Sequence, residues 1–143
     1  MKFTYNDGGR KDAGYKGETG DCAVRAIAIA TGKPYQEVYD KINEIGKSEH
    51  IGKRKRGKSD ARTGVYKRTF KKYIEEELGW KWIPTMFIGQ GCKIHLREKE
   101  LPKGILIARV SKHYVAIING VIQDLYDPSR QGTRCVYGYW QRG

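Results

Sequence analysis

Three residues with the chemistry of a nucleophile, a base and an orienting acid occur in this sequence in the order Cys22, His113 and Asp124. Cysteine attacks as the thiolate, which forms most readily at a helix N-terminus, where unpaired N–H groups and the helix dipole favour an anion. Cys22 has such a position, because the polar segment 19–21 runs directly into an apolar helical segment. We therefore expect Cys22 to attack a carbonyl, His113 to transfer the proton and Asp124 to orient the imidazole ring.

The start of the same helix is also expected to stabilise the oxyanion that forms during such an attack. The candidate donors are the backbone N–H of Cys22 and a group from the preceding turn, at Thr19 or Asp21. Gln90, on a glycine-flanked loop, is a further candidate.

A predicted β-hairpin places the imidazole beside the carboxylate. The pair Asn119-Gly120 lies between two short β-branched runs and is typical of a type I′ turn, which needs positive φ at both positions. With this turn, His113 lies opposite Tyr126, and Asp124 projects from the same side as His113. Diagonal neighbours on a hairpin are about 7–8 Å apart at the backbone, so the two side chains can meet. Asp127 projects to the other face and is the weaker candidate.

Helices are expected in the first half of the chain. The first covers residues 22–30, between an N-cap at Asp21 and a stop at Gly32. The second begins at Pro34 and ends at Gly46. Its apolar stripe consists of Tyr35, Val38, Tyr39, Ile42 and Ile45.

A third helix and a series of strands follow. The third helix ends at Gly79, and its apolar face consists of Tyr66, Phe70, Tyr73, Ile74 and Leu78. Strands are expected at 80–83, 94–96, 105–110, 114–118, 121–126 and 135–140. Residues 1–20 are expected to be an extended lead-in, and 47–64 a mobile basic excursion. The order predicts a single α+β domain over 1–143, with an N-terminal helix bundle packed on a C-terminal antiparallel β-sheet.

The cysteine content argues against a disulfide framework. Three cysteines, with no close pair, favour a reducing cytosol. Cys92 and His95 form one Cys-x-x-His pair, which His50 or Cys135 could complete as a zinc site, but strong zinc motifs contain two such pairs. We therefore predict no metal and no cofactor. Since no apolar run approaches the roughly 20 residues that cross a bilayer, a cytoplasmic protein without a membrane partner is expected.

The net charge of +12 is concentrated in one segment. Residues 53–72 contain ten of the 28 lysines and arginines and a single acid, Asp60. Such a field attracts nucleic acid, an anionic membrane or an acidic protein, and charge alone does not choose among them, although a charge run is often only a solvated face. The candidate contacts are Lys53, Arg54, Lys55, Arg56, Lys58, Arg62, Lys67 and Arg68.

Two motifs carry a family resemblance. The segment Gly20-Asp21-Cys22-Ala23-Val24-Arg25-Ala26-Ile27 and the segment His113-Tyr114-Val115-Ala116-Ile117, followed by Asp124, resemble the papain-like cysteine peptidase superfamily. The Gly-x-Cys-x-x-Arg-Ala pattern is similar to ovarian-tumour-type deubiquitinases. The order of Cys on a helix and then His and Asp on strands resembles bacteriocin-leader peptidases.

Four further segments, at 79–82, 89–92, 111–113 and 126–129, resemble small proteins of phages and prophages, so the resemblance covers most of the chain from about residue 17. It implies a papain-like fold and a phage-encoded cysteine hydrolase in the host cytoplasm. Such an enzyme would cleave an amide or isopeptide bond of a peptide or protein substrate. The chain departs from these families before its cysteine, with Lys16 where papain-type enzymes have an oxyanion-hole glutamine and Thr19 where the deubiquitinase-like pattern has Asp.

Each of these residues also has an interpretation without chemistry. Cys22 could be a small buried apolar residue, His113 could hydrogen-bond within the sheet, and Asp124 could be a polar residue at a strand end. The rival hypothesis for the whole chain is a non-catalytic papain-fold protein that binds nucleic acid or a host protein through its basic segment.

Overall fold

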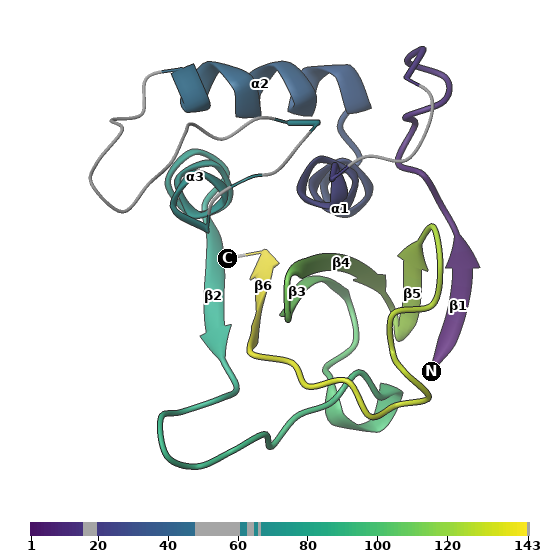
Figure 1. Cartoon of the computed structure of the whole chain (residues 1–143), viewed down its shortest axis with the longest axis vertical. Helices are drawn as coiled ribbons and strands as arrows, with labels where there is room; N and C mark the ends of the chain where they lie inside the picture. Colours follow the sequence, from purple (N-terminus) through teal and green to yellow (C-terminus); the bar gives the residue numbers. More distant parts are fainter. Residues whose placement is uncertain (16–19, 48–60, 63–64, 66, 143) are drawn as a thin grey trace.

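The computed structural model of the protein describes residues 1–15, 20–47, 61–62, 65 and 67–142. These residues form an α+β domain in which helices pack on one face of a six-stranded sheet (Figure 1). The predicted α+β class is confirmed. Most of the expected basic excursion, 47–64, lies outside the described residues.

Two predicted helices agree closely with the structure. Helix α1 (Cys22–Thr31) ends at Gly32, whose φ of 74° and whose N–H bond to Ala28 O form a left-handed cap. Helix α2 (Tyr35–Lys47) follows at once and covers α1 with its apolar stripe.

The third helix departs from the expected geometry. It begins as α3 (Lys67–Lys71) and continues as the π-helical turn η1 (Lys72–Glu77), in which the Leu78 N–H bonds to Tyr73 O. The predicted position of Tyr66 on its face lies outside the described residues.

The strands are β1 (Lys2–Tyr5), β2 (Trp80–Pro84), β3 (Ile105–Val110), β4 (His113–Ile118), β5 (Val121–Asp124) and β6 (Gly138–Arg142), with a short 3-10 helix η2 (Glu98–Glu100) before β3. Their order across the sheet is β1-β5-β4-β3-β6-β2. The strand expected at 94–96 is reduced to an isolated bridge between His95 and Cys135, and β6 begins three residues later than the run at 135–140 predicts.

The prediction of an all-antiparallel sheet is wrong, and the extended lead-in over 1–20 includes a strand of that sheet. Residues Lys2–Tyr5 form β1, which pairs in parallel with β5, so the sheet is mixed. All four side chains of β1 are exposed, and an edge strand held by its backbone alone carries no alternating apolar pattern in the sequence.

The predicted hairpin between β4 and β5 is present. Asn119 and Gly120 have φ values of 48° and 80°, as a type I′ turn requires, and Ile118 lies opposite Val121. This register places His113, at the start of β4, and Asp124, at the end of β5, at the same end of the two strands.

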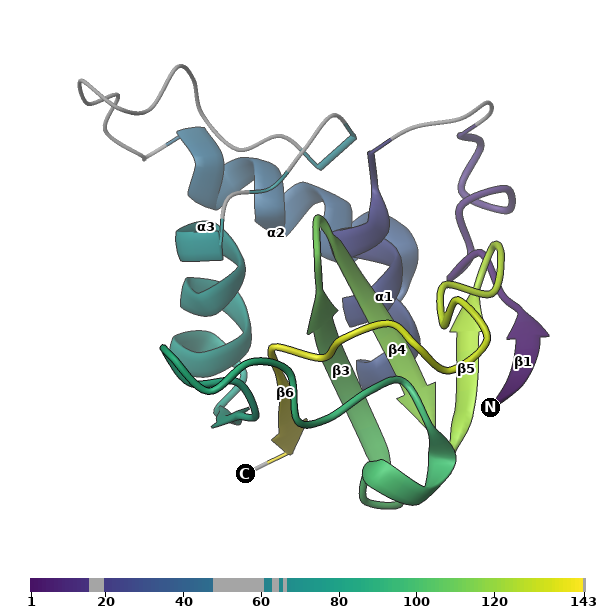
Figure 2. The same cartoon turned by 60° about the horizontal axis from the view of Figure 1, so that its bottom comes forward.

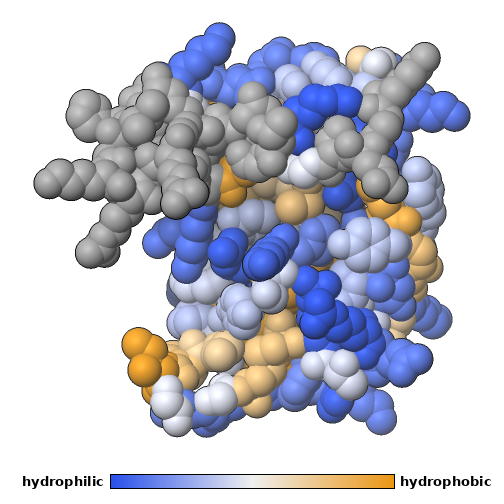
Figure 3. Space-filling view, viewed as in Figure 1, coloured by the Kyte–Doolittle hydropathy of each residue, from blue (hydrophilic) through white to orange (hydrophobic). Residues whose placement is uncertain are grey.

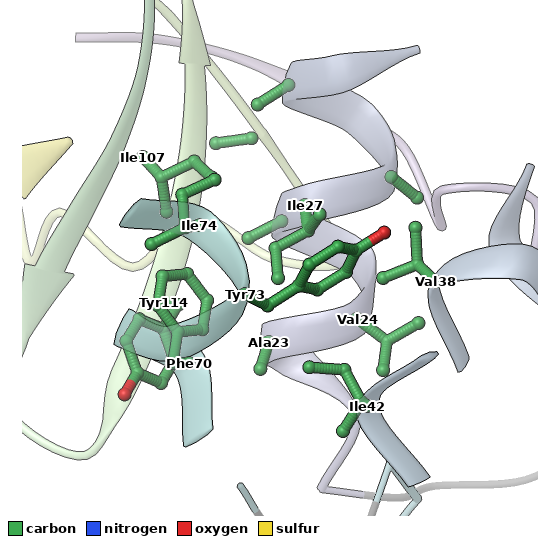
Figure 4. Packing of buried hydrophobic residues seen from close by; sticks show 14 of the residues in the cluster. Ala23, Val24, Ile27, Val38, Ile42, Phe70, Tyr73, Ile74, Ile107 and Tyr114 are labelled. Carbon is green, nitrogen blue, oxygen red and sulfur yellow. The ribbon is translucent and has the colours of Figure 1, made fainter. Parts of the chain in front are cut away.

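Each face of the sheet has its own apolar core. The face toward the helices packs against α1, α2 and α3, with Phe70 stacked on Tyr114 at 4.0 Å between ring centroids (Figure 4). The opposite face is covered by chain segments around Leu96, Leu101 and Val136 rather than by long helices (Figure 2). Tight packing on both sides fixes the strand ends that carry the candidate residues.

A disulfide joins Cys92 to Cys135, and this corrects the prediction from cysteine content. The two residues are 43 positions apart in the sequence, but the isolated bridges Met86–Cys92 and His95–Cys135 bring their Cα atoms to 5.9 Å. The pairing also excludes both thiols as zinc ligands and removes the argument from cysteine content for a reducing compartment. Among the described residues, no helix combines the length and the apolar character needed to cross a bilayer.

Candidate active site

Three elements meet at one edge of the sheet and place the predicted residues together. Cys22 is the first residue of α1, His113 the first of β4 and Asp124 the last of β5. Helix α1 packs against β4, and the contacts of Cys22 with His113 and Tyr114 bring the start of the helix to the start of that strand.

The three side chains form a chain of contacts. His113 Nε2 lies 2.6 Å from Asp124 Oδ2. The Cys22 thiol hydrogen-bonds with the same ring, which leaves Nδ1 as the nitrogen for the sulfur. The backbone N–H of Tyr114 also donates to this sulfur, and Tyr126 stacks on His113 at 5.8 Å between centroids, as the hairpin register predicts.

The charges and hydrogen bonds around these three side chains favour an ion pair between the Cys22 thiolate and the His113 imidazolium. Burial by itself raises the pKa of Cys22, but the contact with His113 and the Tyr114 N–H outweigh it and hold that pKa below its ordinary value of 9.0. Burial lowers the pKa of His113, but hydrogen bonds to Asp124 and Cys22 raise it to about 9. The pKa of Asp124 is lowered, because the contacts with His113, Leu125 N–H and Arg25 exceed the effect of burial.

Arg25 ties this site to the body of α1, a role that our sequence analysis did not assign. Its Nε donates to Asp21 Oδ1 at 2.9 Å and its Nη1 donates to Asp124 Oδ1 at 2.6 Å. The side chain is buried, and the pKa of Arg25 is raised because the two carboxylates outweigh its burial. A single charge on an otherwise apolar helix, four residues after an acid, is the sequence signal that indicates such a bridge.

Asp21 has a different role from the predicted N-cap. It lies at the N-cap position, but its side chain makes no capping hydrogen bond and is fully buried. The carboxylate accepts instead from Arg25, from the Tyr35 hydroxyl at 2.7 Å and from Arg10 at 3.3 Å. A carboxylate surrounded by donors cannot itself donate to an oxyanion, so in the oxyanion role Asp21 keeps its backbone N–H alone.

The other predicted oxyanion donors are not brought to the sulfur. Thr19 lies outside the described residues. Gln90 is exposed in the loop after β2, and β6 and β3 lie between β2 and the strand that carries His113. Asp127, the weaker candidate for the acid, accepts from the Ser129 N–H at 2.9 Å and so stabilises a turn.

The predicted basic contacts are described only in part. Lys53, Arg54, Lys55, Arg56 and Lys58 lie outside the described residues. Arg62 lies 5.6 Å above the Tyr15 ring, Lys67 lies 5.4 Å above the Trp82 ring, and Arg68 is on α3. Within the part of the chain that the structure describes, no group of three His, Cys, Asp or Glu side chains is arranged to hold a metal ion.

Comparison of the chain with protein-family models, with curated proteins and with solved structures finds no match. The function must therefore be argued from the site itself.

Proposed function

We propose that the protein is a cysteine hydrolase that cleaves an amide or isopeptide bond through Cys22, His113 and Asp124. The observation that carries this proposal is the 2.6 Å contact between His113 and Asp124, with the Cys22 thiol on the same ring. A sulfur at a helix start, a base in contact with it and a buried acid behind the base are the parts that nucleophilic catalysis by cysteine needs.

The steps follow from these contacts. The Cys22 thiolate attacks the carbonyl carbon, and the oxyanion forms at the start of α1. The His113 imidazolium then protonates the leaving amine as the C–N bond breaks, which leaves a thioester on Cys22. Neutral His113 next takes a proton from water, the resulting hydroxide attacks the thioester, and the acid product leaves as the thiolate and imidazolium re-form. Asp124 stays ionised throughout and fixes the ring.

The first test measures the rate of Cys22 alkylation by iodoacetamide between pH 4 and 9, by mass spectrometry. We expect Cys22 to react with an apparent pKa below its ordinary value, because His113 and the Tyr114 N–H stabilise the thiolate. The variant His113→Ala should return the pKa toward that value. Peptide and isopeptide substrates are then assayed with the wild type and Cys22→Ala.

A Cys22 that is inert, or that titrates normally whether or not His113 is present, contradicts the proposal. That result would favour the rival hypothesis of a non-catalytic protein that binds nucleic acid or a host protein through residues 53–72. Such a binder should tolerate Cys22→Ala and lose affinity steeply as salt rises.

A further inference from the structure

An apolar loop projects from the end of β2. Met86, Phe87 and Ile88 are 41%, 50% and 105% exposed, and Figure 3 shows an apolar patch over this loop at the lower left. The loop is held at its base, because Met86 bridges to Cys92 and Cys92 is bonded to Cys135. Exposed apolar side chains on a loop that is fixed in this way are typical of a recognition surface.

This loop forms one wall of a groove. The groove has a volume of about 440 Å³ and includes, besides the three apolar loop residues, the side chains of Lys67, Trp82 and Tyr137. Aromatic rings and a single cation around a concave surface suit a large apolar side chain that lies close to a negative charge.

The groove and the nucleophile lie at the same end of the sheet, on one row of paired residues. Pro84 at the groove lies opposite Gly138, Gly138 lies opposite Arg109, and Arg109 lies opposite Tyr114. The Tyr114 N–H reaches the Cys22 sulfur. Three strand spacings give about 14 Å between the groove and the site, which about four residues of an extended peptide span.

Two cations lie near this row, Arg109 on β3 and Lys67 on α3. The Arg109 guanidinium is 5.0 Å from the Tyr114 ring, and Lys67 is 5.4 Å from the Trp82 ring. Burial, Arg109 and Lys71 lower the pKa of Lys67 by more than the nearby Glu75 carboxylate raises it, so positive charge prevails here. Within the described part of the chain, neither Lys67 nor Arg109 forms an ion pair with an acid. An anionic group placed between them would relieve this repulsion.

We propose that this groove binds the substrate of the hydrolase, as an extended peptide with an aromatic or large aliphatic side chain about four residues from the scissile bond and an acidic side chain between the two. The apolar side chain enters between Phe87 and Trp82, and the acid pairs with Lys67 and Arg109. This inference rests on the proposed function, since it takes Cys22 as the reacting centre. A concave site walled by Trp82 and Tyr137 favours a peptide over a bilayer, which would meet the rim residue Ile88 first.

The test compares a fluorescent probe peptide, Phe-Gly-Glu-Gly-Gly-Gly-Glu-Gly-Phe with blocked ends, with two altered versions of it. The probe carries a phenylalanine four residues and a glutamate two residues away on each side of its central glycine. Binding to the full-length Cys22→Ala variant is measured by fluorescence anisotropy. We expect replacement of Phe by Ser, or of Glu by Gln, to weaken binding at least about tenfold. The protein variants Phe87→Ser and Lys67→Gln should weaken binding of the probe peptide similarly, with thermal unfolding midpoints near that of Cys22→Ala. Lys33 follows the C-terminal end of α1, whereas Cys22 is at its start, so Lys33→Gln is the matched control and should leave binding unchanged.

Equal affinity for all three peptides, or unchanged binding in Phe87→Ser and Lys67→Gln, would overturn the proposal. So would binding to phosphatidylserine vesicles that Ile88→Ser abolishes while no peptide binds. Alkylation of Cys22 in the wild type shows whether such a result rejects the groove alone or the proposed hydrolase as well. A reactive Cys22 with no peptide preference rejects the groove alone, whereas an unreactive Cys22 rejects the hydrolase and with it the groove as a substrate site.

Discussion

Arg25 connects two carboxylates that have different roles. Asp21 is held by Arg25, Tyr35 and Arg10, and Asp124 is held by Arg25 and His113. All of these contacts are buried or nearly so, and a buried charge is tolerated only while its partners remain. Arg25 is therefore a positioning residue that acts on the site through Asp124.

The variant Arg25→Gln should lose about 3–5 kcal/mol of the free energy of unfolding, because it leaves two buried carboxylates without their shared cation. Urea unfolding followed by circular dichroism measures the loss. Lys33→Gln is the control, since it breaks an exposed ion pair with Glu37 and should cost no more than about 1 kcal/mol. A loss in Arg25→Gln no larger than in this control would show that the bridge does not hold the site.

The stability of the protein should depend on pH differently with and without the thiol. His113 has an ordinary pKa of 6.5 and a folded pKa of about 9, so its contribution is complete below pH 6.5 and is lost as the pH rises toward 9. Cys22 has a lowered folded pKa, so its contribution is present at pH 9 and is lost as the pH falls. In the wild type, between pH 6.5 and 9, the stability lost through His113 as the pH rises is offset by the stability gained through Cys22.

Cys22→Ala removes one side of this balance. Asp124 still raises the pKa of His113 in that variant, so the free energy of unfolding should fall above pH 6.5, by up to about 1.4 kcal/mol per pH unit, and more steeply than in the wild type. Urea midpoints at pH 6, 7, 8 and 9 measure how steeply the stability of each protein falls. The double variant Cys22→Ala/His113→Gln should lose the steeper fall that Cys22→Ala shows. Parallel curves for the wild type and Cys22→Ala would contradict the ion pair.

At the scale of the elements, local patterns were sufficient to predict the parts that carry the site. The apolar run that begins at Cys22 and the turn at Asn119-Gly120 are specified by neighbouring residues, and both are present. The π-helical turn η1 was not predictable, because the spacing of its apolar residues in the sequence is that of an α-helix. Tertiary packing, which no local pattern reports, changes the number of residues per turn. Strand β1 and the disulfide depend on partners 119 and 43 residues away, and no local pattern reports such partners.

The disulfide is expected to stabilise the loop after β2 as well as the whole domain. Closure of a loop of this size in the unfolded chain is worth about 4 kcal/mol in the chain-entropy model. The double variant Cys92→Ser/Cys135→Ser should lose up to that amount in urea unfolding, and dithiothreitol should produce a similar loss in the wild type. The double variant itself must not respond to dithiothreitol. A wild type that is equally stable with and without the reductant would show that the bond contributes nothing.

At the scale of the whole molecule, the net charge of +12 should act on any anion that approaches Cys22. Iodoacetate and iodoacetamide differ in charge but carry the same leaving group. The rate of alkylation of Cys22 by the anion iodoacetate, divided by the rate with neutral iodoacetamide, should be severalfold higher at about 10 mM salt than at about 500 mM, where the Debye length is short.

Glutathione, measured beside the protein, corrects for the intrinsic difference between the two reagents. Replacement of Lys53, Arg54, Lys55, Arg56 and Lys58 by glutamine should reduce the salt dependence at Cys22 and leave the iodoacetamide rate unchanged. A ratio that does not change with salt would show that the positive field does not reach the nucleophile.

The parallel pairing of β1 with β5 joins segments that are made far apart in time during synthesis. Lys2 is made 119 residues before its partner Val121, and Cys22 is likewise made long before His113 and Asp124. A nascent chain therefore carries the thiol long before it carries the base. Contacts between such distant segments form slowly, so the contacts that lower the pKa of Cys22 arise only once β4 has joined the domain. Until then, the Cys22 thiol lacks the contacts with His113 and Tyr114 that favour its thiolate.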